Sequence, residues 1–149
     1  AGSASKTVRV TKIEATGTAG TLVTVPVTLV KRDAADTGGT AATTTADWAN
    51  NVAQNDNNNA AHTATLIAYS ANPTITDSTP QYMRSAHLTV PVTSAGVATV
   101  PLRWDFGGNR MYPNQELVLR GIAQQACLNL NAVSISTGLL HLSIEWTEE

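Results

Sequence analysis

Strict alternation of apolar and polar residues is the feature of this sequence that most limits its fold. In residues 22–30, Val23, Val25, Val27 and Leu29 are separated by single residues, so one side of an extended chain would be apolar. A repeat of two residues matches the geometry of a strand and not that of a helix. Thr and Val dominate these runs, and both favour pleated backbone because branching at Cβ restricts χ1.

The same alternation recurs along the whole chain and predicts its fold class. We expect strands at residues 7–14, 22–30, 63–69, 86–92, 97–104, 116–122, 126–135 and 139–147. No segment longer than about ten residues has convincing helical spacing. The sequence therefore predicts an all-β protein, an antiparallel β-sandwich that is jelly-roll-like with about eight strands and under ~10% helix.

The length of the chain predicts a single domain. Its 149 residues fit one β-sandwich spanning residues 1–149 and leave no room for two domains. One long loop, at about residues 33–61, interrupts the pattern. Loops of this length are uncommon in compact domains and usually have a function. We expect this loop to be cleaved by proteases in the free protein and protected in an assembly.

Charge is scarce, and this limits the possible partners. Charged residues make up 13% of the chain and its net charge is −2, against ~25% charged residues in typical soluble domains. The basic residues are scattered, so we expect no binding to nucleic acid. No apolar stretch approaches the ~20 residues of a membrane span, and the first residues lack the pattern of a signal segment, so we expect neither a membrane span nor secretion by such a segment. The single cysteine, Cys127, lies in an apolar run and is expected to be a buried thiol.

The sequence contains no recognisable catalytic constellation. His62, His87 and His141 lie in different predicted strands or strand edges, away from metal-ligand spacing. No Gly-X-Ser-X-Gly motif is present, and nothing in the sequence pairs the available carboxylates. We therefore predict that the protein is not an enzyme and uses no cofactor or metal. The long loop carries Asp33, Asp36 and Asp56, which are either calcium ligands or solvated turn residues, and we expect the latter.

Several residues are instead candidates for an interface. Trp48 is a large apolar ring in a polar loop, so it either anchors a subunit contact or packs back onto the sandwich, whereas Trp104 and Trp146 are expected in the core. Three strand prolines, Pro26, Pro91 and Pro101, either shape subunit contacts or block edge-to-edge aggregation. The candidate interface residues are Trp48, Asp36, Thr37, Gly38, Gly39, Asn57, Asn58, Pro26 and Pro91.

Some segments resemble small virion proteins of tailed bacteriophages. The resemblance covers most of the chain beyond residue 20, and its motifs are structural rather than catalytic. The segments that carry it are residues 27–40 with Asp36-Thr37-Gly38-Gly39-Thr40, 64–74, 102–107, 118–123, 128–131 and 144–149.

This resemblance implies a structural role in a virus particle. It implies a capsid decoration or cement protein that binds the major capsid protein or other virion proteins, associates with itself, and is located in the virion after assembly in the bacterial cytoplasm. Symmetric, repeated contacts would provide the stability. Two alternatives are a tail or fibre component and a carbohydrate-binding β-sandwich. The second needs exposed aromatic residues on one face, for which Trp48, Tyr69, Tyr82 and Tyr112 are available.

Overall fold

The computed structural model confirms the all-β prediction. It describes residues 1–41, 53, 56, 58–71, 73–93, 100–107, 116–131, 133, 135 and 137–149, and these contain strands but no α-helix. The strands are β1 (Thr7–Thr18), β2 (Val23–Arg32), β3 (Thr40–Ala41), β4 (Tyr69–Ala71), β5 (Gln81–Val90), β6 (Leu102–Asp105), β7 (Leu117–Arg120), β8 (Gln125–Asn129) and β9 (Leu139–Glu148).

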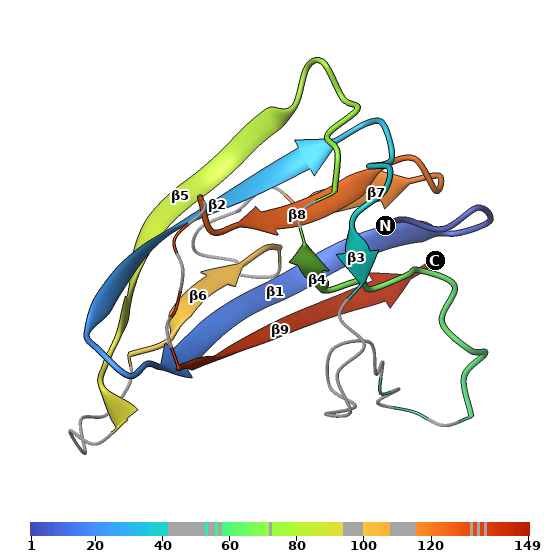
Figure 1. The fold of residues 1–149 in the computed structure, drawn as a ribbon. Helices are drawn as coiled ribbons and strands as arrows, with labels where there is room; N and C mark the ends of the chain where they lie inside the picture. The colour runs from blue at the N-terminus through green and yellow to red at the C-terminus, as the bar shows by residue number, and fades with distance from the viewer. Residues whose placement is uncertain are drawn as a thin grey trace.

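Two antiparallel sheets form the layers of a sandwich (Figure 1). In the first, β9 pairs with β1 from Val8 to Thr18, while β6 and β7 pair with separate halves of β1. Because a strand has only two edges, β6 and β7 must follow one another along the edge of β1 opposite β9. In the second sheet, β2 lies between β5 and β8. Among the described strands, β3 and β4 pair with each other alone.

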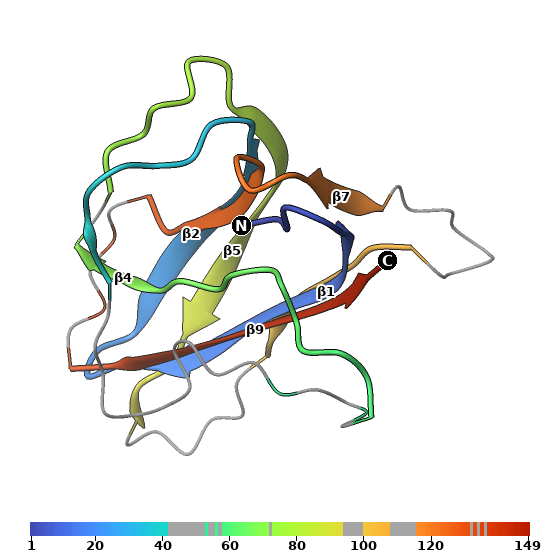
Figure 2. The ribbon, with the colours of Figure 1, turned by 90° about the vertical axis from the view of Figure 1, so that its right-hand side faces the viewer.

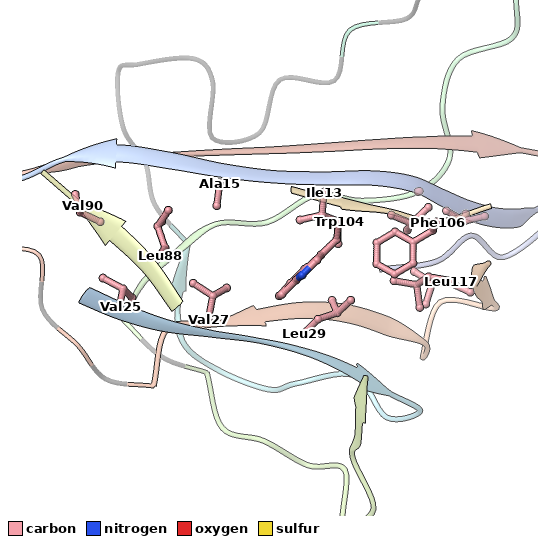
Figure 3. Packing of buried hydrophobic residues seen from close by; sticks show 14 of the residues in the cluster. Ile13, Ala15, Val25, Val27, Leu29, Leu88, Val90, Trp104, Phe106 and Leu117 are labelled. Atoms are coloured by element: carbon pink, nitrogen blue, oxygen red, sulfur yellow. The ribbon is translucent and has the colours of Figure 1, made fainter. Parts of the chain in front are cut away.

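The core lies between the two sheets and is built from the alternating residues (Figure 3). Every second residue of β2 from Val25 to Leu29 is fully buried, as the sequence predicts. Trp104 and Phe106 fill the centre, with 8% and 2% of their surface exposed. Trp146 is only partly buried and packs against the same cluster. The two sheets therefore share one hydrophobic core, which accounts for their close packing.

A β-bulge at Thr11 explains an irregularity in the first strand. Val8 and Val10 are buried, but so are Ile13 and Ala15, which are out of phase with them. The pairing of β1 with β9 shifts between Val10 and Lys12, so one extra residue restores the inward direction of both pairs. The backbone oxygen of Thr11 accepts a hydrogen bond from Phe106 N, at the point where β6 gives way to the segment leading to β7.

The prediction of a strand at residues 63–69 is wrong. Only Tyr69 belongs to a strand, and the preceding residues lie extended beside the sandwich, where Figure 2 shows them in green leading to β4. Their backbone groups are bonded outside any ladder: Thr65 N donates to Ala1 O, and Thr63 N donates to the carboxylate of Glu148. Ala64 is buried in the core. The segment thus closes one side of the sandwich.

The jelly-roll and eight-strand details are not confirmed. In the described part of the chain, the main sheets hold seven strands, four in one and three in the other, and the short β3–β4 ribbon stands apart from them. A jelly roll is built from eight strands in two Greek keys. The class of antiparallel β-sandwich is confirmed, and the finer topology is not.

Candidate interaction surface

The outer face of the β9–β1–β6/β7 sheet carries charged side chains that are paired with one another. Alternation in β1 turns Arg9, Lys12 and Glu14 away from the core. The register then places Glu145 opposite Lys12, and Arg103 opposite Glu14. Cross-strand neighbours of opposite charge attract each other. The register therefore gathers opposite charges on this one face.

Ion pairs connect these groups across the face. Arg9 contacts the carboxylates of Glu116 and Glu149, the second at 3.1 Å, and Lys12 contacts Glu145. Arg103 binds Asp105 at 2.9 Å, and this hydrogen bonding lowers the pKa of the Asp105 carboxyl. Each of these charges already has a partner within the chain, so the face offers few unpaired charges to another molecule.

The opposite outer face, on the β5–β2–β8 sheet, has no Asp, Glu, Lys or Arg along residues 24–28 of β2 and 85–89 of β5. These residues form its exposed half. Outward-facing residues of β2 and β5 are cross-strand neighbours here: Thr24 opposite Thr89, Pro26 opposite His87, and Thr28 opposite Ser85. All but Pro26 and Thr28 are exposed, and those two are half-buried. We name these six residues the neutral face: Thr24, Pro26, Thr28, Ser85, His87 and Thr89.

Asn131 completes the backbone bonding at the border of the neutral face. β8 pairs with β2 from Thr28 to Arg32, so Pro26 has β5 on one side and no described strand on the other. The Asn131 Nδ2 group donates to Pro26 O at 3.0 Å and to Thr28 Oγ1 at 3.1 Å. Proline therefore occupies a position whose missing N–H would face this open side, which is where a strand tolerates it.

A shallow depression lies at one end of the neutral face. A register shift between Leu29 and Val30 leaves Met83 as an extra residue in β5, and the depression of about 380 Å³ is lined by Thr28, Tyr82, Met83, Arg84 and Ser85. Tyr82 is 74% exposed, which is high for an aromatic ring. The guanidinium of Arg84 lies 4.3 Å from the centre of the Phe106 ring. The depression thus combines an exposed ring with two hydroxyl groups.

The Asp36–Gly39 turn, predicted as part of an interface, is anchored to the protein itself. The side chain of Asp36 is only 3% exposed and forms a buried ion pair with Arg32. Thr37 forms an isolated bridge with Thr74, with backbone hydrogen bonds of 3.1 and 2.8 Å. Gly38 and Gly39 both have positive φ, and a Cβ on Gly39 would approach Pro73 Cα to 2.9 Å, so a side chain there would be strained. Thr37, Gly38 and Gly39 are exposed, in contrast to Asp36.

A second contact fixes the beginning of the same long loop. Asp33 N donates to the carboxylate of Asp77 at 2.9 Å, and Thr76 Oγ1 donates to Ala35 O at 2.6 Å. The Asp33 N–H and then the Thr79 N–H hold the pKa of Asp77 below its ordinary value. Residues 33–37 are therefore bound to residues 74–79. Sequence patterns gave no indication of this pairing.

The remaining predicted interface residues are less informative. Trp48 and Asn57 lie outside the described residues. Asn58 is exposed, and its N–H is bound to Asp56 Oδ1 at 2.9 Å. Pro91 is buried directly after β5, and its carbonyl accepts a hydrogen bond from Ala19 N at 2.9 Å. Of the two prolines, only Pro26 reaches the surface, on the neutral face.

Glu148 is an important residue that sequence reasoning missed. Its side chain is 8% exposed, and its carboxylate accepts hydrogen bonds from Thr63 N, Thr63 Oγ1, Ala64 N and Trp146 Nε1 at 2.8–3.1 Å. Burial alone would raise its pKa, but these donors together lower the pKa to about 2. The residue directly follows the predicted strand at residues 139–147, and no sequence pattern indicates that its carboxylate is buried. Its function here is structural.

The described residues contain no group of three or more His, Cys, Asp or Glu that could hold a metal ion. The Cys127 thiol is half-buried and not fully buried as predicted, and desolvation raises its pKa. No helix in the described part of the chain is long and apolar enough to cross a membrane.

Comparison with known proteins identifies no relative: no family model, no curated protein and no solved structure matches this chain.

Proposed function

We propose that this protein is a virion structural protein of a tailed bacteriophage that decorates or cements the capsid. One observation carries the proposal beyond the sequence resemblance. Charges on one outer face are paired internally, while the exposed half of the other face has none. An uncharged face of Thr, Ser, Pro and His can approach a neighbouring protein without the cost of desolvating ions.

Repetition of such contacts by many copies on one particle would make them sufficient for stable binding. A single neutral face offers modest affinity, because small polar contacts gain little once bonds to water are replaced. On a symmetric shell, self-association of copies converts each further contact into an intramolecular one and multiplies the effect. The major capsid protein, or another virion protein, is the proposed partner. Trp48 stays a candidate anchor for this contact.

Binding to emptied, undecorated capsids, measured by co-sedimentation, tests the proposal. Wild-type protein should sediment with capsids. Thr24→Glu places a charge on the neutral face and should reduce binding about tenfold, since an unpaired charge in an interface costs over 1.4 kcal/mol. Ser143→Glu, on the exposed outer side of β9, is the matched control and should bind as wild type does.

Trp48→Ala is compared in the same experiment at an equal folded fraction. If Trp48 anchors the interface, its truncation should cost about 2 kcal/mol or more of association, the scale of a hot spot. Undiminished binding would assign Trp48 to ordinary packing. Failure of wild-type protein to bind capsids would remove the decoration role and favour a tail or fibre component.

The depression beside Tyr82 favours a second candidate, a carbohydrate-binding module. Sugars commonly stack on exposed aromatic rings while hydroxyl groups bind their edges, and here Tyr82 adjoins Thr28 and Ser85. Screening against bacterial surface glycans distinguishes the two functions. Binding that is lost in Tyr82→Ala, without capsid binding, would establish this alternative.

A further inference from the structure

The outer edge of β5 is an unusual surface of this sandwich. β5 is ten residues long, lies at the edge of its sheet, and pairs with β2 alone among the described residues. Its outward residues Ser85, His87 and Thr89 are all exposed. An exposed strand edge presents unpaired N–H and C=O groups, which form a template for another strand.

The direction of these backbone groups follows from the neighbouring bonds. Successive residues of an antiparallel strand point their N–H and C=O groups to opposite sides. The Pro91 carbonyl accepts a hydrogen bond from Ala19 N, and the Thr93 N–H donates to Ala19 O. Ala19 directly follows β1 of the other sheet, so these backbone groups point away from β2. Ser85, His87 and Thr89 are separated from Pro91 by even numbers of residues, so their backbone N–H and C=O groups point to the same side, away from β2. The chain thus uses this edge at residues 91–93, and no described residue pairs with the edge at residues 85–89.

We propose that β5 pairs antiparallel with β5 of a second copy of this chain, joining the two three-stranded sheets into one sheet of six strands. This rests on the proposed function in one respect, because it names the contact through which copies associate on the particle. A twofold contact places the same set of side chains on both sides, so an edge whose charges were of one sign would repel its own copy. The outward side chains of β5 at this edge are neutral, and the one charged residue, Arg84, is engaged with Phe106 and Asp105.

The outer edge of β9 is less suited to pairing with a second copy. It is also ten residues long, but it carries Glu145 and Glu148. Near its end, Glu148 binds Thr63 and Ala64, so the segment that closes the sandwich lies beside this strand. The β5 edge is therefore the better candidate for self-association.

The bulge at Met83 and the proline at position 91 define the register. Between them, the regular part of β5 runs from Arg84 to Val90 and is centred on His87. Full overlap in a twofold arrangement places His87 opposite its own counterpart and Ser85 opposite Thr89 of the second copy. These are the residues whose backbone groups point outward, so each opposed pair can exchange hydrogen bonds.

Analytical ultracentrifugation of the full chain over a concentration series tests the proposal. A contact through one strand edge is small, so we expect a weak dimer with a dissociation constant of about 10 μM–1 mM. In the double variant Ser85→Lys with Thr89→Lys, lysines face lysines, and the dimer should weaken about tenfold. In Ser85→Lys with Thr89→Glu, each new lysine faces a new glutamate, and dimerisation should equal or exceed that of wild type.

Ser143→Lys on the other sheet is the matched control and should dimerise as wild type does. A circular dichroism spectrum and an unfolding curve for each variant establish that it is folded. A monomer at every concentration would overturn the β5 contact, as would equal dimerisation by the two double variants. Capsid co-sedimentation separates the two ideas: a monomer that binds capsids ends the β5 inference alone, whereas a β5 dimer that does not bind capsids ends the proposed function alone.

Discussion

Glu148 joins three parts of the chain through one carboxylate. It comes from the end of β9, binds Thr63 and Ala64 in the segment that closes the sandwich, and lies 3.7 Å from Lys6 Nζ. Replacement by Gln removes the charge and puts an amide N–H₂ where only acceptors fit. Since buried hydrogen bonds to a charged group contribute about 1.5–3 kcal/mol each, Glu148→Gln should lower the free energy of unfolding by about 2–3 kcal/mol. Urea denaturation measures this.

Glu145→Gln provides the control for that substitution. Glu145 lies near the same end of β9 and pairs with Lys12, but over half of its side chain is exposed. Exposed ion pairs contribute little, so the unfolding curve should scarcely change. Equal effects of the two substitutions would mean that the Glu148 hydrogen bonds do not stabilise the fold.

The same carboxylate predicts how stability depends on acid. Its pKa is lowered from 4.5 to about 2 in the folded protein, so the unfolded chain binds this proton more readily. The contribution of Glu148 is therefore complete above pH 4.5 and is lost as the pH falls from there to about 2. At about 1.4 kcal/mol per pKa unit, the loss is on the order of 3 kcal/mol. Unfolding measured from neutral pH to pH 2 should show this decline, and Glu148→Gln should flatten it.

At the scale of elements, β5 should tolerate proline according to the direction of each N–H. The Ala86 N–H points toward β2, opposite Val27, whereas the His87 N–H points outward. Ala86→Pro removes a ladder bond and should cost about 3 kcal/mol or more, a loss comparable to that of proline within a helix. His87→Pro removes no such bond and should cost about 1 kcal/mol or less. Chemical denaturation of the two variants in dilute solution compares them, and equal costs would contradict the assigned direction of the edge.

Local sequence patterns predict those strands whose buried and exposed residues alternate regularly along the chain. The alternation of β2 and β9 was visible because each strand keeps one face toward the core over most of its length. The bulge in β1 is also encoded, since Val8–Val10 and Ile13–Ala15 are out of phase, although their phase difference was not used in the prediction. Residues 63–69 share the composition of a strand, but their position beside Glu148 and Ala1 depends on groups distant in sequence. No local pattern contains that information.

The candidate surface depends on tertiary register and was predictable only in part. The sequence marked Pro26 as a candidate residue, and it lies in the part of β2 that pairs with β5 but not with β8. Sequence alone could not separate the charges into one face, because that requires β6, β7 and β9 to be placed beside β1. The burial of Asp36 against Arg32 could not be predicted either, since turn residues of this composition are usually solvated.

At the scale of the whole molecule, charged side chains lie on one outer face and not on the other. The salt dependence of capsid binding therefore tests which of the two faces contacts the capsid. The paired face carries Arg9, Lys12, Arg103 and their acidic partners, and the neutral face carries no charge. Raising ionic strength from about 0.05 M to about 0.5 M shortens the screening length from roughly 14 Å to 4 Å and weakens contacts between exposed charges. If the neutral face binds the capsid, affinity should change less than about threefold over this range. A steep fall in co-sedimented protein with added salt would mean that the charged face makes the contact, with its ion pairs exchanged for intermolecular ones. The capsid contact would then have to be sought on the β9–β1–β6/β7 sheet.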